Sequence, residues 1–126
     1  MTKHRILLSA LMVAAMATVA FAADVTGTWT TSFDTQIGPQ KYTYTFKVDG
    51  NKLTGKAKGE SAEINGETEI TDGVVNGDDI SFVETITYQG MAIPINYKGK
   101  IAGDEIKFTR TILDMFTEEL VAKRVK

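Results

Sequence analysis

Hydrophobic and polar residues alternate along most of the chain from residue 25 onward, with the period of two that is typical of β-strands. The alternation is clearest at 41–48, where Tyr, Phe and Val share one parity and Lys and Thr occupy the other. Segments rich in Gly, Asp and Asn, which favour turns, separate several of these stretches. The pattern predicts eight strands, at about 25–33, 41–48, 53–57, 67–75, 79–88, 92–101, 105–112 and 117–125.

An eight-residue pattern occurs three times and predicts where the chain turns. Ile101–Phe108 repeats Val75–Phe82 with its polar residues changed, and Val48–Gly55 is a weaker third copy. The copies begin at residues 48, 75 and 101, a spacing that fits two strands with their connections and does not fit a helical repeat. One glycine in each copy is predicted to form a hairpin turn with positive φ, and the three turns should lie at one end of the sheet. These glycines are Gly50, Gly77 and Gly103.

Eight strands in this order predict an all-β fold, a small eight-stranded antiparallel up-and-down meander barrel. Closure of the sheet would remove the unpaired edges that an open sheet must protect. Asp72-Gly73 lies inside the fourth strand and is interpreted as a bulge. The connections at the end opposite the three glycines are predicted at 34–40, 59–66, 89–91 and 113–116.

Residues 1–22 have the pattern of a secretory signal peptide. A positive start at 3–5 precedes an apolar run at 6–19, and Ala20-Phe21-Ala22 supplies the small-x-small sequence that signal peptidase recognises. The apolar run is shorter than the roughly 20 residues that a membrane-spanning helix needs. Cleavage after Ala22 would leave one β-barrel domain, residues 23–126, exported to the periplasm or the extracellular space and not stably inserted in a membrane.

The composition of residues 23–126 excludes several kinds of chemistry. The only histidine, His4, lies in the leader, and the chain has no cysteine, so zinc sites built on these residues and His-dependent nucleophiles are excluded. Lys3 and Arg5 also leave with the leader, so 12 basic residues remain against 16 acidic ones, a net charge of −4 that disfavours nucleic acid as a partner. No calcium loop or phosphate-binding glycine loop is evident. We therefore assign no catalytic residue, metal or cofactor from the sequence.

One short motif suggests a family. Gly27-Thr28-Trp29 in the first strand, followed by an antiparallel meander and by Arg124 near the end of the chain, resembles the lipocalin and calycin superfamily of ligand-binding barrels. The resemblance implies that Trp29 closes one end of the barrel and that Arg124 packs over it. Residues 23–126 are also similar to small secreted bacterial proteins that end in a sequence like Ala122-Lys123-Arg124.

Apolar residues are concentrated in the connections at the end opposite the glycine turns. They fit the mouth of a binding site for a small ligand, and they fit equally a hydrophobic lid folded over a filled core. The residues are Ile37, Met91, Leu113, Met115 and Phe116.

Two opposite charges occupy equivalent inward positions in successive copies of the repeat. Glu84 lies four residues after Ile80, and Arg110 lies four residues after Ile106. Because an isolated charge inside a barrel is costly, the two side chains are expected to meet, directly or through a tyrosine or water. They form either a buried structural pair or, with surrounding aromatic residues, the polar anchor of a ligand cavity. The candidate ligand-binding residues are Tyr44, Phe46, Phe82, Glu84, Tyr97, Phe108 and Arg110, with Ile95 as a further wall residue.

Three functions from different classes remain open. The first is an exported barrel that binds a small, partly apolar ligand in its interior or at its open end. The second is a non-catalytic accessory or interaction module, and the third is a small lyase or isomerase that uses Glu84 as general base with a tyrosine and Arg110. Glu118-Glu119 is interpreted as part of a solvated face. The sequence predicts neither the identity of the ligand nor the oligomeric state.

Overall fold

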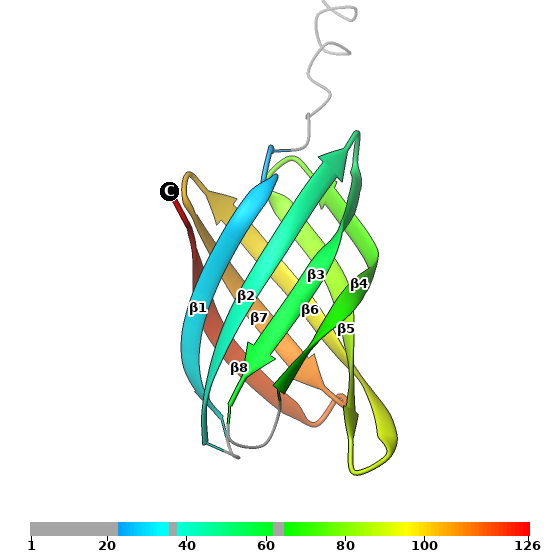
Figure 1. Ribbon diagram of the computed structural model, residues 1–126. Coiled ribbons are helices and arrows are strands. Elements are labelled where there is room, and N and C mark those ends of the chain that lie inside the picture. The colour runs from blue at the N-terminus through cyan, green and yellow to red at the C-terminus, as the bar shows by residue number, and fades with distance from the viewer. Residues whose placement is uncertain (1–22, 36–37, 62–64) are drawn as a thin grey trace, which may run out of the picture.

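The computed structural model describes residues 23–35, 38–61 and 65–126, and the predicted signal peptide at 1–22 lies outside them. Each of its eight strands pairs antiparallel with the next along the chain, and β1 pairs with β8, so the sheet closes into a barrel (Figure 1). The predicted all-β, eight-stranded antiparallel up-and-down barrel is therefore confirmed. The strands are β1 (Gly27–Thr35), β2 (Gly38–Asp49), β3 (Lys52–Glu60), β4 (Asn65–Asn76), β5 (Asp79–Tyr88), β6 (Met91–Ala102), β7 (Glu105–Ile112) and β8 (Phe116–Arg124).

Within the described ranges, no helix has both the length and the apolar composition needed to cross a membrane.

The three repeated glycines turn the chain at one end of the barrel, as predicted. They connect β2 to β3, β4 to β5 and β6 to β7, and their φ angles are 64°, 59° and 63° for Gly50, Gly77 and Gly103. In each two-residue turn the glycine comes first, which is the arrangement of a type II′ hairpin. We call this end the glycine-turn end. The opposite end, which carries the turns at 89–90 and 113–115, is called the open end (Figure 1).

The strands at the open end are longer than the sequence predicted. β1 and β2 stay paired as far as Thr35 and Gly38, and β3 and β4 as far as Glu60 and Asn65, so the predicted connections at 34–40 and 59–66 were too long. The physical reason is that strands pair through hydrogen bonds between backbone groups. Polar side chains at the rim of a barrel therefore do not end the pairing. Ile37 lies outside the described residues.

The predicted bulge in β4 is confirmed. The pairing of β4 with β5 shifts between Thr71 and Val74, and Asp72 has a φ of 54°. An extra residue of this kind bends the strand and increases its twist, which a small closed barrel requires.

Aromatic rings fill the middle of the barrel. Tyr42, Tyr44 and Phe46 stack along β2, with ring centroids 5.5 and 5.7 Å apart. The residues paired with them on β3 are Gly59, Ala57 and Gly55, so small residues lie opposite each large ring. At Gly55 a Cβ would overlap the carbonyl oxygen of Thr45, which makes glycine necessary there. The small residues of β3 thus leave the space that these rings occupy.

Five of the buried rings form one cluster between the two ends. Their centroids lie 4.4 to 6.0 Å apart, in the stacked, tilted and edge-to-face arrangements that aromatic pairs prefer. Each ring is 2% exposed or less. The cluster comprises Tyr44, Phe46, Phe82, Tyr97 and Phe108.

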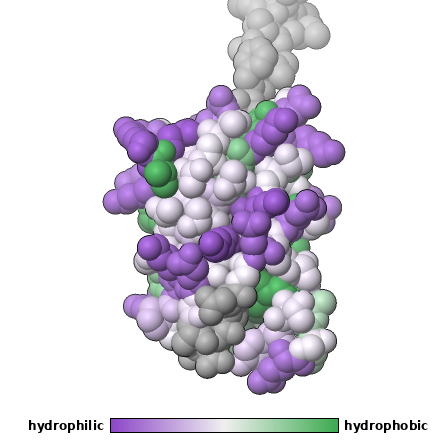
Figure 2. All heavy atoms as spheres, viewed as in Figure 1, coloured by the Kyte–Doolittle hydropathy of each residue, from purple (hydrophilic) through white to green (hydrophobic). Residues whose placement is uncertain are grey.

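The seam between the first and last strands is the shortest ladder in the barrel. β1 and β8 pair only at Trp29 with Arg124 and at Thr30 with Lys123, whereas β7 and β8 pair from Glu105 to Ile112. A shallow hollow of about 470 Å³ lies beside the seam, lined by residues that include Phe33 and Leu120. Outside the barrel, hydrophilic side chains cover much of the face in Figure 2, as expected for strand positions that point to solvent.

Candidate functional site

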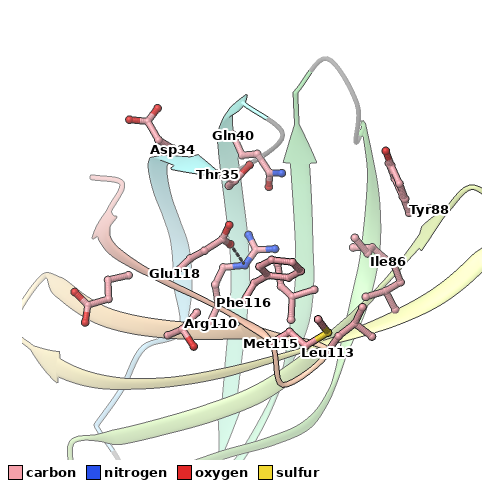
Figure 3. A pocket seen from close by; sticks show the side chains of 14 residues that line it. Asp34, Thr35, Gln40, Ile86, Tyr88, Arg110, Leu113, Met115, Phe116 and Glu118 are labelled. Carbon is pink, nitrogen blue, oxygen red and sulfur yellow. Dashed lines mark ion pairs between the residues drawn. The ribbon is translucent and has the colours of Figure 1, made fainter.

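A cavity of about 870 Å³ opens at the open end of the barrel (Figure 3). Its volume lies in the range of about 300 to 1,000 Å³ that is typical of small-ligand sites. Apolar side chains from β5, β6, β7, the β7–β8 turn and β8 line it: Ile86, Ile93, Ile112, Leu113, Met115 and Phe116. Polar and charged side chains complete the lining: Asp34, Thr35, Gln40, Tyr88, Arg110, Thr117, Glu118 and Glu119.

Arg110 is the buried cation of this cavity. Its side chain is 1% exposed, and Figure 3 shows its guanidinium between the side chains of Glu118 and Phe116. The guanidinium carbon lies 5.0 Å from the ring centroid of Phe33 and 5.1 Å from that of Tyr42, within cation–π range. Burial alone would lower the pKa of Arg110, but the nearby Tyr97, Tyr42 and Glu84 outweigh it and leave that pKa raised. Arg110 therefore stays positively charged inside the barrel.

Glu118 is the ion-pair partner of Arg110, a role that was not predicted from the sequence. The two residues are cross-strand neighbours on β7 and β8, and Arg110 Nε lies 3.3 Å from Glu118 Oε1. The Glu118 side chain is only 13% exposed, so its interpretation as part of a solvated face was wrong. The inward orientation of Glu118 did have a signal in the sequence, because Glu118 has the same parity as the apolar residues Leu120 and Ala122.

Glu84 ends a chain of buried hydroxyl groups. The Tyr44 hydroxyl donates to the Tyr97 hydroxyl at 2.9 Å, and the Tyr97 hydroxyl donates to Glu84 Oε1, also at 2.9 Å. Glu84 is 2% exposed, so its predicted inward orientation is confirmed, as is that of Arg110. Burial raises the pKa of Glu84, and the charge of Arg110 and the Tyr97 hydroxyl only partly oppose this effect. Glu84 and Arg110 thus interact through their charges, while the ion pair of Arg110 is with Glu118.

Several buried polar atoms around Arg110 have no hydrogen-bond partner among the described residues. They are donors as well as acceptors, and three of the residues that carry them line the cavity. Buried polar groups normally bond to protein, to ordered water or to a ligand, so such a group of atoms is unusual. The atoms are Gln40 Oε1, Tyr42 Oη, Arg110 Nε, Arg110 Nη1 and Glu118 Oε1.

The structure separates the predicted ligand-binding residues into two groups. Arg110 lines the open-end cavity. The other six, Tyr44, Phe46, Phe82, Glu84, Tyr97 and Phe108, lie in the packed interior, where five of them form the aromatic cluster. Ile95 is also fully buried.

Apolar residues lie at the open rim, as the sequence analysis described. Met91 and Met115 are 66% and 74% exposed, and Leu113 is 51% exposed. Leu113 has a φ of 56°, a conformation that is uncommon for a residue other than glycine. The sequence did not indicate Gln40 as a cavity residue, because it fell within the predicted connection at 34–40.

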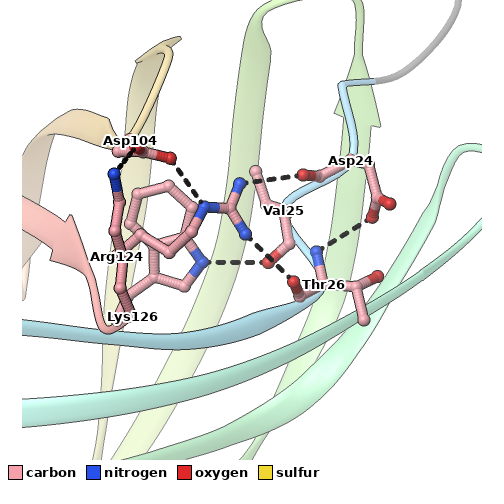
Figure 4. A network of polar contacts seen from close by, with 7 residues as sticks. Asp24, Val25, Thr26, Asp104, Arg124 and Lys126 are labelled. Atoms are coloured by element: carbon pink, nitrogen blue, oxygen red, sulfur yellow. Dashed lines mark hydrogen bonds and ion pairs between the residues drawn. The ribbon is translucent and has the colours of Figure 1, made fainter.

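Trp29 and Arg124 lie together at the glycine-turn end (Figure 4). The guanidinium carbon of Arg124 is 4.5 Å from the ring centroid of Trp29, and the indole donates to the Val25 carbonyl oxygen at 2.9 Å. Arg124 also donates to Asp104 Oδ1 at 3.0 Å and to the carbonyl oxygens of Asp24 and Thr26 at 3.1 Å each. Hydrogen bonds from Lys126 and Arg124 lower the pKa of Asp104.

Among the residues that the structure describes, no group of three or more His, Cys, Asp or Glu side chains is arranged to hold a metal ion. Comparison of this chain with protein-family models, with curated proteins and with solved structures gives no match.

Proposed function

We propose that this protein is an exported barrel that binds a small, partly apolar ligand in the cavity at its open end. The observation that carries the proposal is the cavity itself. Six apolar side chains line it, together with a buried guanidinium whose Nε and Nη1 have no hydrogen-bond partner among the described residues. A concave apolar site with a few fixed polar groups is the usual form of a small-ligand site. Kinship with the lipocalin and calycin barrels is part of this proposal, and the contact of Arg124 with Trp29 supports it.

Export of the barrel also remains a proposal. Its support is the signal-peptide pattern of residues 1–22, together with the packing that begins directly after it. The Ala23 amide donates to the Gly77 carbonyl oxygen at 3.0 Å, and Val25 is fully buried. An amino terminus created by cleavage after Ala22 would keep this hydrogen-bond donor.

Titration with N-phenyl-1-naphthylamine, a neutral apolar dye that fluoresces when it leaves water, tests the proposal. We expect saturable binding, and we expect Ile93→Trp, which adds a bulky side chain to the cavity wall, to weaken it by more than about tenfold. Val48→Trp is the matched control, because Val48 is also partly buried but lies near the glycine-turn end. The proposal fails if the folded protein does not bind the dye, or if the two variants bind it equally well.

An interaction module is the second candidate, and the exposed rim favours it. Met91 and Met115 present apolar surface to solvent at the same end of the barrel. A lyase or isomerase that uses Glu84 as general base has less support, since Glu84 is buried and does not line the cavity. Failure to bind the dye would favour the interaction module.

A further inference from the structure

One charged group of each sign faces the inner part of the open-end cavity. They are the carboxylate of Glu118 and the guanidinium of Arg110, the basic side chain among the described lining residues, whereas Asp34 and Glu119 lie at exposed rim positions. Arg110 already forms an ion pair with Glu118 and interacts with the charge of Glu84 behind it. The positive charge of Arg110 is therefore not free to neutralise an additional anion.

The unpaired polar atoms around the cavity include both donors and acceptors. Arg110 Nε and Nη1 can only donate, whereas Gln40 Oε1 and Glu118 Oε1 can only accept. The Arg110–Glu118 ion pair at 3.3 Å leaves Nε and Oε1 without a well-oriented hydrogen bond. A ligand that satisfies these atoms must therefore supply hydrogen-bond acceptors and donors together.

Charged ligand groups satisfy only half of these atoms. A carboxylate could accept from Arg110, but it has no proton to donate to Gln40 Oε1 and would be repelled by Glu118. An ammonium group could donate to those oxygens, but it accepts nothing and would be repelled by Arg110. A hydroxyl or a primary amide both donates and accepts, and it adds no charge.

We propose that the ligand of the open-end cavity is an uncharged amphiphile whose polar group is a hydroxyl or a primary amide. This group accepts from Arg110 and donates to the oxygen of Gln40 or of Glu118, and the two N–H donors of an amide can reach both. Its apolar part packs on Ile86, Ile93 and Ile112. This proposal rests on the proposed function and specifies the chemical class of the ligand. It assigns Gln40 and Glu118 as specificity-determining residues for the uncharged polar group.

Four probes with the same ten-carbon chain test the proposal by displacing the bound dye at pH 7.5. They are 1-decanol, decanamide, decanoate and decylammonium, each below its micelle-forming concentration. We expect 1-decanol and decanamide to bind at least about tenfold more tightly than the two charged probes. Decanoate or decylammonium binding as tightly as 1-decanol would overturn the proposal and leave the proposed function standing. A protein that does not bind the dye would instead contradict the proposed function.

Two variants test the assigned roles. Glu118→Gln removes a negative charge at nearly constant volume, so the preference for 1-decanol over decanoate should shrink severalfold. Glu69→Gln removes the same charge from an exposed position on β4 and should leave the preference unchanged.

Gln40→Met removes the acceptor and should weaken 1-decanol binding by about tenfold. Circular dichroism and urea unfolding should show all three variants folded. An unchanged decanol-to-decanoate preference in folded Glu118→Gln, together with unchanged decanol binding in folded Gln40→Met, would contradict the assigned roles.

Discussion

Arg110 is the residue at which the packed interior and the cavity meet. On one side its guanidinium faces the rings of Phe33, Tyr42 and Tyr97, at 5.0 to 5.4 Å from their centroids. On the other side it faces Glu118 and the cavity. A charge that is 1% exposed depends on such neighbours, because water cannot solvate it directly.

Removal of Arg110 should therefore destabilise the barrel. Arg110→Met would leave the carboxyl groups of Glu84 and Glu118 without their cation, and we expect a loss of about 3 kcal/mol in the free energy of unfolding. Glu84→Gln combined with Arg110→Met should recover part of this loss, which a double-mutant cycle in urea measures. Lys107→Met, at an exposed position of the same strand, is the control. Equal stabilities of Arg110→Met and Lys107→Met would contradict this account.

The raised pKa of Glu84 predicts a pH-dependent difference in stability. The native state keeps the Glu84 proton at pH values where the unfolded chain has lost it, so wild-type stability falls as the pH rises above about 4.5. The glutamine in Glu84→Gln does not titrate, so this pH dependence is absent from the variant. The raised pKa of Glu118 affects the wild type and the variant alike and cancels in the difference between them. The variant should therefore gain stability relative to the wild type as the pH rises, by at most about 1.4 kcal/mol per pH unit. Urea unfolding between pH 4.5 and 8 measures the difference, and a difference that shrinks with rising pH would refute the assignment.

The sequence predicted the inward positions of Glu84 and Arg110 because strand parity assigns side chains to one face. It could not predict that Arg110 pairs with Glu118, because the register between β7 and β8 decides which residues face each other. It also could not show that the rings of Tyr44, Phe82 and Tyr97 fill the space around Glu84. Packing of this kind depends on side-chain volume and contact, which periodicity does not describe.

At the scale of strands and turns, local signals were more informative. The repeated glycines and the Asp72-Gly73 bulge were predicted because each requires a particular backbone conformation. The ends of β1 to β4 at the open rim were not predicted, because the residues there are polar and have the composition of a connecting loop. Only the backbone pairing of Thr35 with Gly38, and of Glu60 with Asn65, shows that the ladder continues.

Gly103 provides a test of the turn conformation. Its φ is 63°, and no atom lies within 4 Å of a Cβ added there, so a larger side chain would meet strain in the backbone and not a clash. We expect Gly103→Val to lower the free energy of unfolding by more than about 1 kcal/mol. Gly103→Asn should lower it less, because asparagine tolerates positive φ. A neutral effect of Gly103→Val, measured by urea unfolding, would show that the turn does not require this conformation.

At the scale of the whole molecule, the two ends of the barrel differ. At the glycine-turn end Arg124 packs over the ring of Trp29, and the open end holds the cavity. Arg124 also lies on the short seam between β1 and β8, where only two residue pairs join the first strand to the last. The contacts of Arg124 therefore lie at the point where the first strand meets the last.

Replacement of Arg124 should lower the stability of the barrel without changing dye binding. Arg124→Met removes three hydrogen bonds of a partly exposed cation and its contact with Trp29, and we expect a loss of about 2 kcal/mol in the free energy of unfolding. Dye binding at the opposite end should not change. Lys123→Met, at an exposed position beside it, should affect stability much less. Loss of dye binding in folded Arg124→Met would mean that the two ends are coupled.

The central claim is that ligand binding is confined to the open end. Titration of the ¹⁵N-labelled protein with N-phenyl-1-naphthylamine, followed by amide chemical shifts, tests it most directly. We expect dose-dependent shifts for the amides of Ile93, Arg110, Ile112 and Leu113, and no shifts for those of Gly50, Gly77 and Gly103. Shifts concentrated at the glycine-turn end or on the outer face of the barrel, or no shifts at saturating dye, would contradict the account.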